Sequence, residues 1–347
     1  MKLLIDEMDN ASRWKALAPD LATPSGEISL SDDKAAFKFG DDHTSGRIVG
    51  STRAAGHVLR RDLAGLNLSE MDEIRLWGRS NRPAGTAADG SFFLEMKLAS
   101  AAMGFDDPNN KWRRPLVFLQ PGSWELIRLS IADLPPQVRG AVTGMQLKCI
   151  NSDAAFTCNL DSCLAVREEM LADVEQELVA RTHQKVTVDG TPVSASIFNP
   201  DAPAPALPYI RITPYDMQLA EQRSVTADLR MDYTETGFRI APPRIGYDLY
   251  YDFDVYAASR SVKTQVFEYL LRVFAPRSEL VVNGLPLSIE LAPSAPSDYV
   301  VPQRVDRTVL RFKVQTWLAK AATGETAKRP FAKISIEGEP SLAGIGA

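Results

Sequence analysis

Hydrophobic and polar residues alternate most regularly between positions 247 and 256. One side of this segment is aromatic and aliphatic, and it consists of Tyr247, Leu249, Tyr251, Phe253 and Val255. The other side is polar and acidic, and it consists of Asp248, Tyr250, Asp252, Asp254 and Tyr256. Because successive side chains of a strand point to opposite faces of its sheet, the pattern predicts a strand with one buried face.

The spacing becomes helical directly after this strand, where Val262, Val266, Leu270 and Val273 form one stripe. Ser259 or Ser261 offers a hydroxyl that can accept from an unpaired N–H of the first helical turn. Pro276 is expected to end the helix, because proline cannot continue the backbone hydrogen bonding. The strand and helix carry no nucleophile, metal cluster or phosphate-binding loop, so the unit is interpreted as a scaffold.

Residues 1–166 show short apolar runs separated by turn-forming clusters. We predict strands within residues 35–39, 73–77, 92–98, 116–119, 125–129, 145–150 and 156–166. Many short strands with regular turns predict a β-sandwich.

Residues 167–318 mix helix and strand patterns. A helix from Glu168 is expected to bury Leu171, Val174 and Leu178. Further predicted elements are a proline-rich loop at 199–208, a strand at 209–212, a polar excursion at 215–243 with a hairpin at Thr236–Gly237, a hairpin at 280–291 with a type I′ turn at Asn283–Gly284, and a strand at 307–317. Residues 319–347 form a C-terminal arm with one candidate strand at 331–336, expected to be mobile or to become ordered on a partner.

The composition indicates an ordinary folded protein. A length of 347 residues favours two domains, and 45% hydrophobic with 24% charged residues argues against general disorder. The net charge of −5 gives no reason to expect a sequence-specific nucleic-acid partner. The first apolar run is too short for a signal peptide, and no segment is long enough to span a membrane.

The three cysteines, Cys149, Cys158 and Cys163, are expected to be buried free thiols. Three thiols without a nearby histidine do not complete a tetrahedral zinc site. On one extended strand Cys158 and Cys163 would face opposite ways, so a disulfide between them would need a turn. We expect no cofactor.

The segments 72–80, 122–130 and 156–164 resemble the strand signatures of galactose-binding-like jelly rolls, the sandwich of many carbohydrate-binding modules. The resemblance implies a structural calcium ion for which Asp6 and Asp161 are candidates; the alternative is two surface carboxylates. Glycan recognition needs exposed aromatic rings. Trp77 and Trp124 are expected in the core, whereas Trp112 lies in a basic loop and is the candidate for glycan contact.

Residues 168–318 resemble the tail-terminator, or tail-completion, proteins of long-tailed bacteriophages. The resemblance is carried by Ala206-Leu207-Pro208-Tyr209-Ile210, by residues 247–274 and by the strand at 309–317. It implies a homo-oligomeric ring, six-fold in most members, that caps the tail tube in the virion and meets the neck and head–tail connector. The expected fold is therefore an all-β jelly-roll sandwich (1–166), then an α+β domain with an antiparallel sheet and packed helices (167–318), then the arm (319–347).

Opposite charges on the two long strands are candidates for the ring interface, since a closed ring joins two different surfaces of each subunit. The candidates are Asp248, Asp252 and Asp254 on one strand and Arg304, Arg307, Arg311 and Lys313 on or beside the other. The alternative, about equally favoured, is that these charges pair across strands within one chain.

Catalysis is not expected, because His43, His57 and His183 are scattered and no catalytic motif is present. The hypothesis is a structural virion protein made in the host cytoplasm, a tail-terminator or neck subunit with the jelly roll as an outward decoration. The alternatives are a carbohydrate-binding protein, whose partner is a surface glycan, or another neck or baseplate component.

Overall fold

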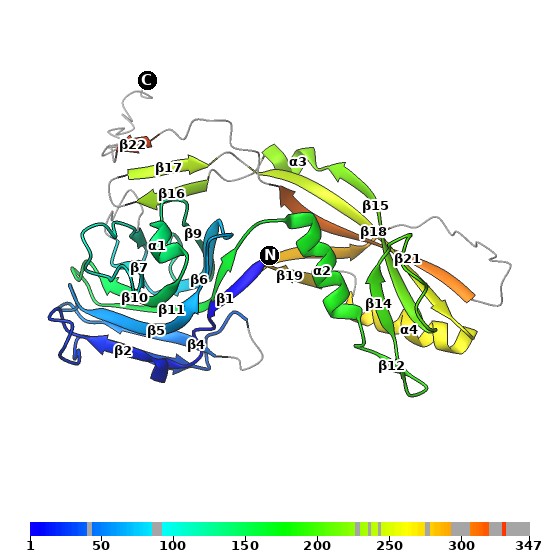
Figure 1. Ribbon diagram of the computed structural model, residues 1–347, viewed down its shortest axis with the longest axis horizontal. Helices are drawn as coiled ribbons and strands as arrows, with labels where there is room; N and C mark the ends of the chain where they lie inside the picture. Colours follow the sequence, from blue (N-terminus) through cyan, green and yellow to red (C-terminus); the bar gives the residue numbers. More distant parts are fainter. Residues whose placement is uncertain are drawn as a thin grey trace, which may run out of the picture.

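Figure 1 shows the computed structural model. The structure describes residues 1–39, 44–84, 92–225, 230–234, 237–241, 244–274, 278–292, 306–318 and 328–330, with the backbone alone for 224–225, 230–234, 237–241, 306–308 and 328–330. None of the described helices is long and apolar enough to cross a membrane.

The first half of the chain forms two antiparallel sheets that face each other, hereafter the sandwich (Figure 1). The first sheet has the order β3-β4-β11-β6-β9, with β1 also on β11; its strands are β1 (Lys2–Asp6), β3 (Ile28–Asp33), β4 (Ser45–Gly50), β6 (Glu73–Ser80), β9 (Glu125–Ser130) and β11 (Phe156–Val166). The second has the order β2-β5-β10-β7-β8; its strands are β2 (Trp14–Leu17), β5 (Val58–Leu66), β7 (Leu94–Ser100), β8 (Arg114–Pro115) and β10 (Val142–Cys149). Short helices η1 (Ala11–Arg13) and α1 (Pro136–Arg139) lie in the connections.

One hydrophobic core joins the two sheets, with fully buried residues such as Ile48 and Leu160 from the first and Leu59 and Leu147 from the second. This confirms the predicted sandwich. The alternation of inward and outward residues follows from the two-residue period of the strands.

All three cysteines are free and fully buried in this core. Cys158 and Cys163 both face inward because the pairing of β11 shifts between Asp161 and Leu164, where Ser162 has a φ of 50°. The expectation that they face opposite ways is therefore wrong, since a bulge changes the two-residue period. Burial raises the pKa of the Cys149 thiol to about 11.

The second half contains a six-stranded sheet of order β14-β15-β18-β21-β20-β19, hereafter the mixed sheet. Its strands are β14 (Ser194–Ile197), β15 (Tyr209–Leu219), β18 (Ile245–Ala257), β19 (Ser278–Val282), β20 (Leu285–Leu291) and β21 (Asp306–Leu318). The prediction of an antiparallel sheet is wrong at one edge. Because β14 runs parallel to β15, the sheet is mixed.

A second hydrophobic core lies between this sheet and two helices, α2 (Met170–Thr182) and α4 (Arg260–Val273). The predicted buried side of β18 is confirmed, and Phe253, Phe274 and Phe312 pack with ring centroids 5.0–5.6 Å apart. Ser259 caps α4 by accepting from Val262 N at 3.3 Å. The expectation for Leu171 is wrong: it is 43% exposed, and Met170 is buried in its place.

Three smaller elements complete the described chain. A hairpin of β12 (Thr187–Val188) and β13 (Thr191–Pro192) follows α2, and α3 (Glu221–Val225) follows β15. The strands β16 (Arg230–Thr234) and β17 (Gly237–Ala241) form the predicted hairpin, although Thr236 lies outside the described residues. This hairpin pairs with β22 (Lys328–Pro330) and lies beside β8 and β9 of the sandwich (Figure 1).

Candidate functional site

The acidic face of β18 is paired with basic residues of the same chain. Arg311 lies opposite Asp252 in register, and its Nε and Nη2 donate to the two carboxylate oxygens at 2.7 and 3.0 Å. Asp254 is 2% exposed and accepts from Nε and Nη2 of Arg211 on β15 at 3.2 and 3.1 Å. Such paired hydrogen bonds satisfy both groups without a partner chain.

The remaining predicted charges follow the same pattern where the structure describes them. Asp248 contacts Arg223 of α3, and its Oδ2 lies 3.9 Å from Lys313 Nζ. Lys313 also contacts Glu290, whose hydrogen bond raises the pKa of the lysine. The hydrogen bond with Asp252 likewise raises the pKa of Arg311.

Of the two uses considered for these charges, the structure therefore shows the pairing within one chain for Asp248, Asp252, Asp254, Arg311 and Lys313. The main chain of Arg307 lies opposite Tyr256, and its side chain is outside the described atoms. Arg304 lies outside the described residues. A role of this charged face in a ring interface stays a prediction, and the geometry gives it no support.

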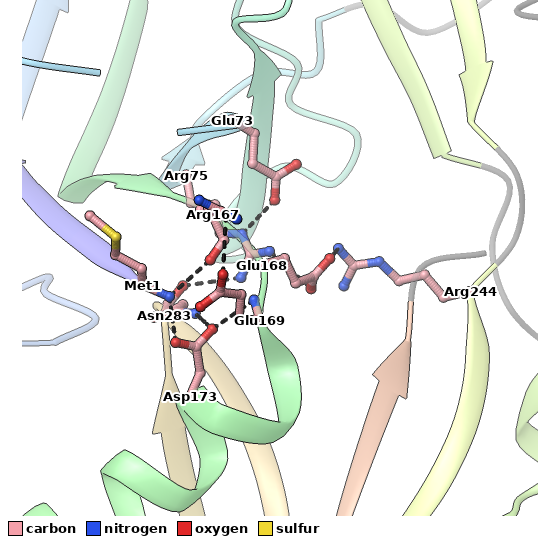
Figure 2. Close-up of polar contacts among 9 residues, drawn as sticks. All are labelled: Met1, Glu73, Arg75, Arg167, Glu168, Glu169, Asp173, Arg244 and Asn283. Atoms are coloured by element: carbon pink, nitrogen blue, oxygen red, sulfur yellow. Dashed lines mark hydrogen bonds and ion pairs between the residues drawn. The ribbon is translucent and has the colours of Figure 1, made fainter. Parts of the chain in front are cut away.

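The two cores meet at a polar junction that sequence reasoning did not foresee (Figure 2). The turn between β19 and β20 contacts β6 of the sandwich: Trp77 Nε1 donates to Gly284 O at 2.8 Å, and Arg75 Nη1 donates to Asn283 O at 3.3 Å. The turn residues have φ of 50° and 74°, as the predicted type I′ turn requires. Trp77 is 8% exposed, so its expected place in the interior is confirmed.

A chain of ion pairs runs through this junction. Arg75 is 0% exposed and lies 2.6 Å from Glu73 and 3.1 Å from Glu168, and Glu168 in turn lies 3.1 Å from Arg244. Figure 2 shows these four side chains one after another, from Glu73 through Arg75 and Glu168 to Arg244. Each member is neutralised by a neighbour, so the charges can be removed from water without an unpaired buried ion.

Asp173 of α2 holds the same turn from the other side. Its Oδ2 accepts from Asn283 Nδ2 at 2.6 Å and from Glu169 N at 3.0 Å, and its Oδ1 contacts the amine of Met1 (Figure 2). Asn283 is 3% exposed and Asp173 is 6% exposed. The buried Asn283–Gly284 turn is therefore hydrogen-bonded both to the sandwich and to α2, which holds the two halves of the chain in one arrangement.

The expected exposure of Trp112 is wrong. Its side chain is 2% exposed, its Nε1 donates to Ser130 O at 3.1 Å, and Arg114 stacks on its ring with 5.2 Å to the centroid. A ring buried in this way cannot serve as a platform for a sugar. Trp124, expected in the core, is only half-buried and lies directly before β9.

The two calcium candidates are buried and bonded to protein groups. Asp6 Oδ2 lies 2.5 Å from Arg61 Nε, and Asp6 Oδ1 accepts from Met8 N at 2.6 Å. Asp161 Oδ2 accepts from Lys38 N at 2.6 Å and from Phe39 N at 3.1 Å. Each is 2% exposed, so the alternative of two surface carboxylates is wrong.

Asp6 and Asp161 are held by donors of the protein itself. Burial raises the pKa of both carboxyls, and the backbone donors oppose that shift. Within the described ranges, no group of three or more His, Cys, Asp or Glu side chains is placed to hold a metal ion. Calcium binding by this pair stays a prediction.

A polar pocket of about 240 Å³ lies on the second sheet of the sandwich, on the side opposite the core. Strands β7 and β10 supply Glu95, Lys97, Gln146 and Lys148, and the β7–β8 loop supplies the rest, including Phe105, Asn110, Lys111 and Arg113. Asn110 is 1% exposed, and its Oδ1 has no donor among the described groups. Burial, together with Arg113, lowers the pKa of Lys97.

One edge of the mixed sheet is open within the described part of the chain. Residues 209–212 of β15 pair with both β14 and β18, whereas residues 213–219 pair with β18 alone. Along this segment, hereafter the open edge, Tyr215, Met217 and Leu219 are 58%, 50% and 53% exposed. An edge with unpaired main chain and exposed apolar side chains is a place for another strand to add.

No protein-family model matches the sequence, and no curated protein matches it. Among solved structures, the chain is similar to a family 11 carbohydrate-binding module of a cellulosomal cellulase of Clostridium thermocellum, with 10% identity, TM-score 0.33, and coverage of 48% of this chain and 95% of that one. It is similar to a family 30 module from the same organism with 11% identity, TM-score 0.33, and coverage of 49% and 99%.

The chain is also similar to the sheath/tube terminator of an extracellular contractile injection system, with 16% identity and TM-score 0.36. That likeness covers 51% of this chain and 67% of the other. All three TM-scores and identities are too low to carry an argument about function.

Proposed function

We propose that this chain is a structural subunit of a long-tailed bacteriophage, a tail-terminator or neck protein that assembles with copies of itself into a ring. In this proposal residues 167–318 are an α+β ring-forming domain at the end of the tail tube, next to the head–tail connector. The sandwich is carried on the outside of the virion, and neither half has a catalytic role.

Support comes from the order and packing of the elements. Helix α2, the proline-rich loop, β15, the excursion, β18, α4, the β19–β20 hairpin and β21 follow in the order expected from the resemblance of residues 168–318. All the long strands of this set belong to one sheet, with α2 and α4 packed against it in one core.

The observation that carries the proposal is the open edge of β15. Among the described residues, 213–219 have a paired strand on one side only, and three large side chains of this segment, Tyr215, Met217 and Leu219, are at least half exposed. A subunit of a closed ring needs a surface that fits a different surface of the next copy. The open edge is suited to such a contact because added strands gain affinity from main-chain hydrogen bonds.

Native mass spectrometry and negative-stain microscopy of the purified full-length chain test this proposal. The expected result is one closed oligomer with a central opening. A chain that stays monomeric at micromolar and higher concentrations would overturn it.

A second function, binding of a surface glycan by the sandwich, is favoured by the polar pocket on β7 and β10. The pocket offers amide, ammonium and guanidinium donors that suit a sugar hydroxyl or carboxylate, and Phe105 supplies one aromatic wall. Trp112 has no part in it.

Calorimetric titration with host-cell polysaccharide tests the glycan hypothesis. Binding is expected to weaken about tenfold in Lys111→Ala, since a lost charged hydrogen bond is worth roughly 1.5–3 kcal/mol. Lys185→Ala, an exposed lysine between α2 and β12 in the other half of the chain, is the matched control. Saturable binding that is equal in both variants would exclude the pocket.

A further inference from the structure

The open edge of β15 has two chemically different faces. Met217 lies opposite Leu249 and Leu219 opposite Tyr247, so both point to the side of the sheet that carries α4. Asp216 lies opposite Tyr250 and Gln218 opposite Asp248, so both point to the charged side. An added strand would therefore need apolar residues at alternate positions and polar residues between them.

The side chains of Asp216 and Gln218 make local hydrogen bonds along the open edge. Asp216 Oδ1 accepts from Met217 N at 2.8 Å, and Gln218 Nε2 donates to Asp216 Oδ2 at 2.8 Å. The Asp216 carboxylate thus accepts the hydrogen bond of a main-chain N–H. The carbonyl of an added strand could take its place as the acceptor. The strand has a bulge at Tyr215, whose ring centroid lies 3.4 Å from the guanidinium carbon of Arg311.

The sequence after β22 has the matching pattern. Ala332, Ile334 and Ile336 alternate with Phe331, Lys333 and Ser335, so one side is apolar and the other is polar apart from its first residue. On one strand these would present an apolar side for Met217 and Leu219 and a polar side whose lysine fits Asp216. The preceding strand β22 pairs with β17 beside the sandwich and lies away from β15 of its own chain (Figure 1).

We infer that residues 331–336 of one copy add as a strand to the open edge of β15, residues 213–219, of a second copy. The inference rests on the proposed self-assembly and specifies which two segments form the contact between copies. The arm of each subunit binds the edge of the next, which is a head-to-tail contact and closes a ring when repeated. The same pairing removes the exposed edge of every subunit.

Cysteine cross-linking between mixed single variants tests this contact in the full-length chain. Met217→Cys protein is mixed with Ile334→Cys protein and oxidised, so a disulfide between the two new thiols can form only between copies. Cys149, Cys158 and Cys163 are each 0% exposed and give no background. We expect roughly 100-fold more cross-linked dimer than in the control mixture, because contact raises the effective thiol concentration from about 10 micromolar to about 1 millimolar.

The control mixture pairs Leu171→Cys with Ile334→Cys. Leu171 is 43% exposed on α2, close to the 50% of Met217, but lies on a different element. Equal cross-linking in the two mixtures would overturn the inference. So would an intrachain disulfide in the double variant Met217→Cys/Ile334→Cys at high dilution, because the arm would then bind its own edge.

Native mass spectrometry of the same samples separates the two proposals. A ring without the specific cross-link leaves the proposed function standing and rejects the arm contact. Monomers alone reject the proposed function. Leu219→Glu supplies a second measurement, since a carboxylate on the apolar face should reduce the cross-link about tenfold or more.

Discussion

Arg75 is a cation with no exposed surface, placed where the two cores meet. Three acceptors hold it, from Glu73 on its own strand, Glu168 before α2 and the carbonyl of Asn283. These residues are far apart in the sequence, so the guanidinium joins three segments at once. Removing it would leave two partly or fully buried carboxylates with less compensation.

Arg75→Met should therefore lower the free energy of unfolding by about 3–5 kcal/mol, the usual loss when one partner of a buried ion pair is removed. Urea denaturation followed by tryptophan fluorescence measures it. Arg272→Ala is the control, because its side chain is 79% exposed and its pair with Glu268 lies on a helix surface. The control should lose less than about 1 kcal/mol. A similar small loss in both variants would show that the junction does not depend on Arg75.

The turn between β19 and β20 does more than reverse the chain. Its two residues adopt left-handed φ values, which Asn and Gly tolerate best, and its carbonyls accept from Arg75 and Trp77. A Cβ at Gly284 would lie 3.3 Å from Leu164 Cδ1 of the sandwich. The glycine is therefore needed for the conformation and for the close approach of the two halves.

Gly284→Ala is expected to lose about 1–2 kcal/mol from the left-handed conformation and about 1 kcal/mol more from crowding at the junction. Gly190→Ala is a matched control, since Gly190 ends the Asp189–Gly190 turn with φ of 78° and has open space where its Cβ would be. Urea unfolding of both variants compares the two turns. Equal losses would mean that contact with Leu164 contributes nothing.

Across the whole molecule, the charges of the mixed sheet are used inside the chain. Asp252, Asp254 and Asp248 all have described basic partners on neighbouring elements. Assembly through this face would have to separate those pairs, whereas assembly through the open edge leaves them in place. If copies assemble as proposed, the groups available at the open edge are main-chain and apolar groups more than charges.

The proposed ring is accordingly expected to resist salt. Raising sodium chloride from about 0.05 M to about 0.5 M shortens the range of charge interactions to a few ångströms but leaves strand pairing intact. Sedimentation velocity should show the same oligomer at both concentrations. The charge swap Asp252→Arg/Arg311→Asp should keep it, and Leu219→Glu should weaken it by about tenfold or more in Kd. Dissociation by salt would contradict this prediction and would favour the charged face of β18 and β21 as the interface.

The sequence by itself determined most of the local structure. Alternation identified β18 and the described part of β21, helical spacing identified α4 with its Ser259 cap, and Asn-Gly identified the turn of the β19–β20 hairpin. These features depend on neighbours in sequence, through side-chain periodicity and backbone preferences. The sandwich followed from the same regularity of strands and turns.

Only the tertiary structure decided what each polar group does. Trp112 sits in a basic loop yet is buried, because packing against Arg114 and a bond to Ser130 depend on how that loop folds back. The bulge at Ser162 moved Cys163 into the core, and strand register assigned Arg311 to Asp252. The junction at Arg75 joins residues that are far apart in the sequence, and the open edge of β15 depends on which strands pair with it. Neither feature produces a periodic pattern in a single sequence.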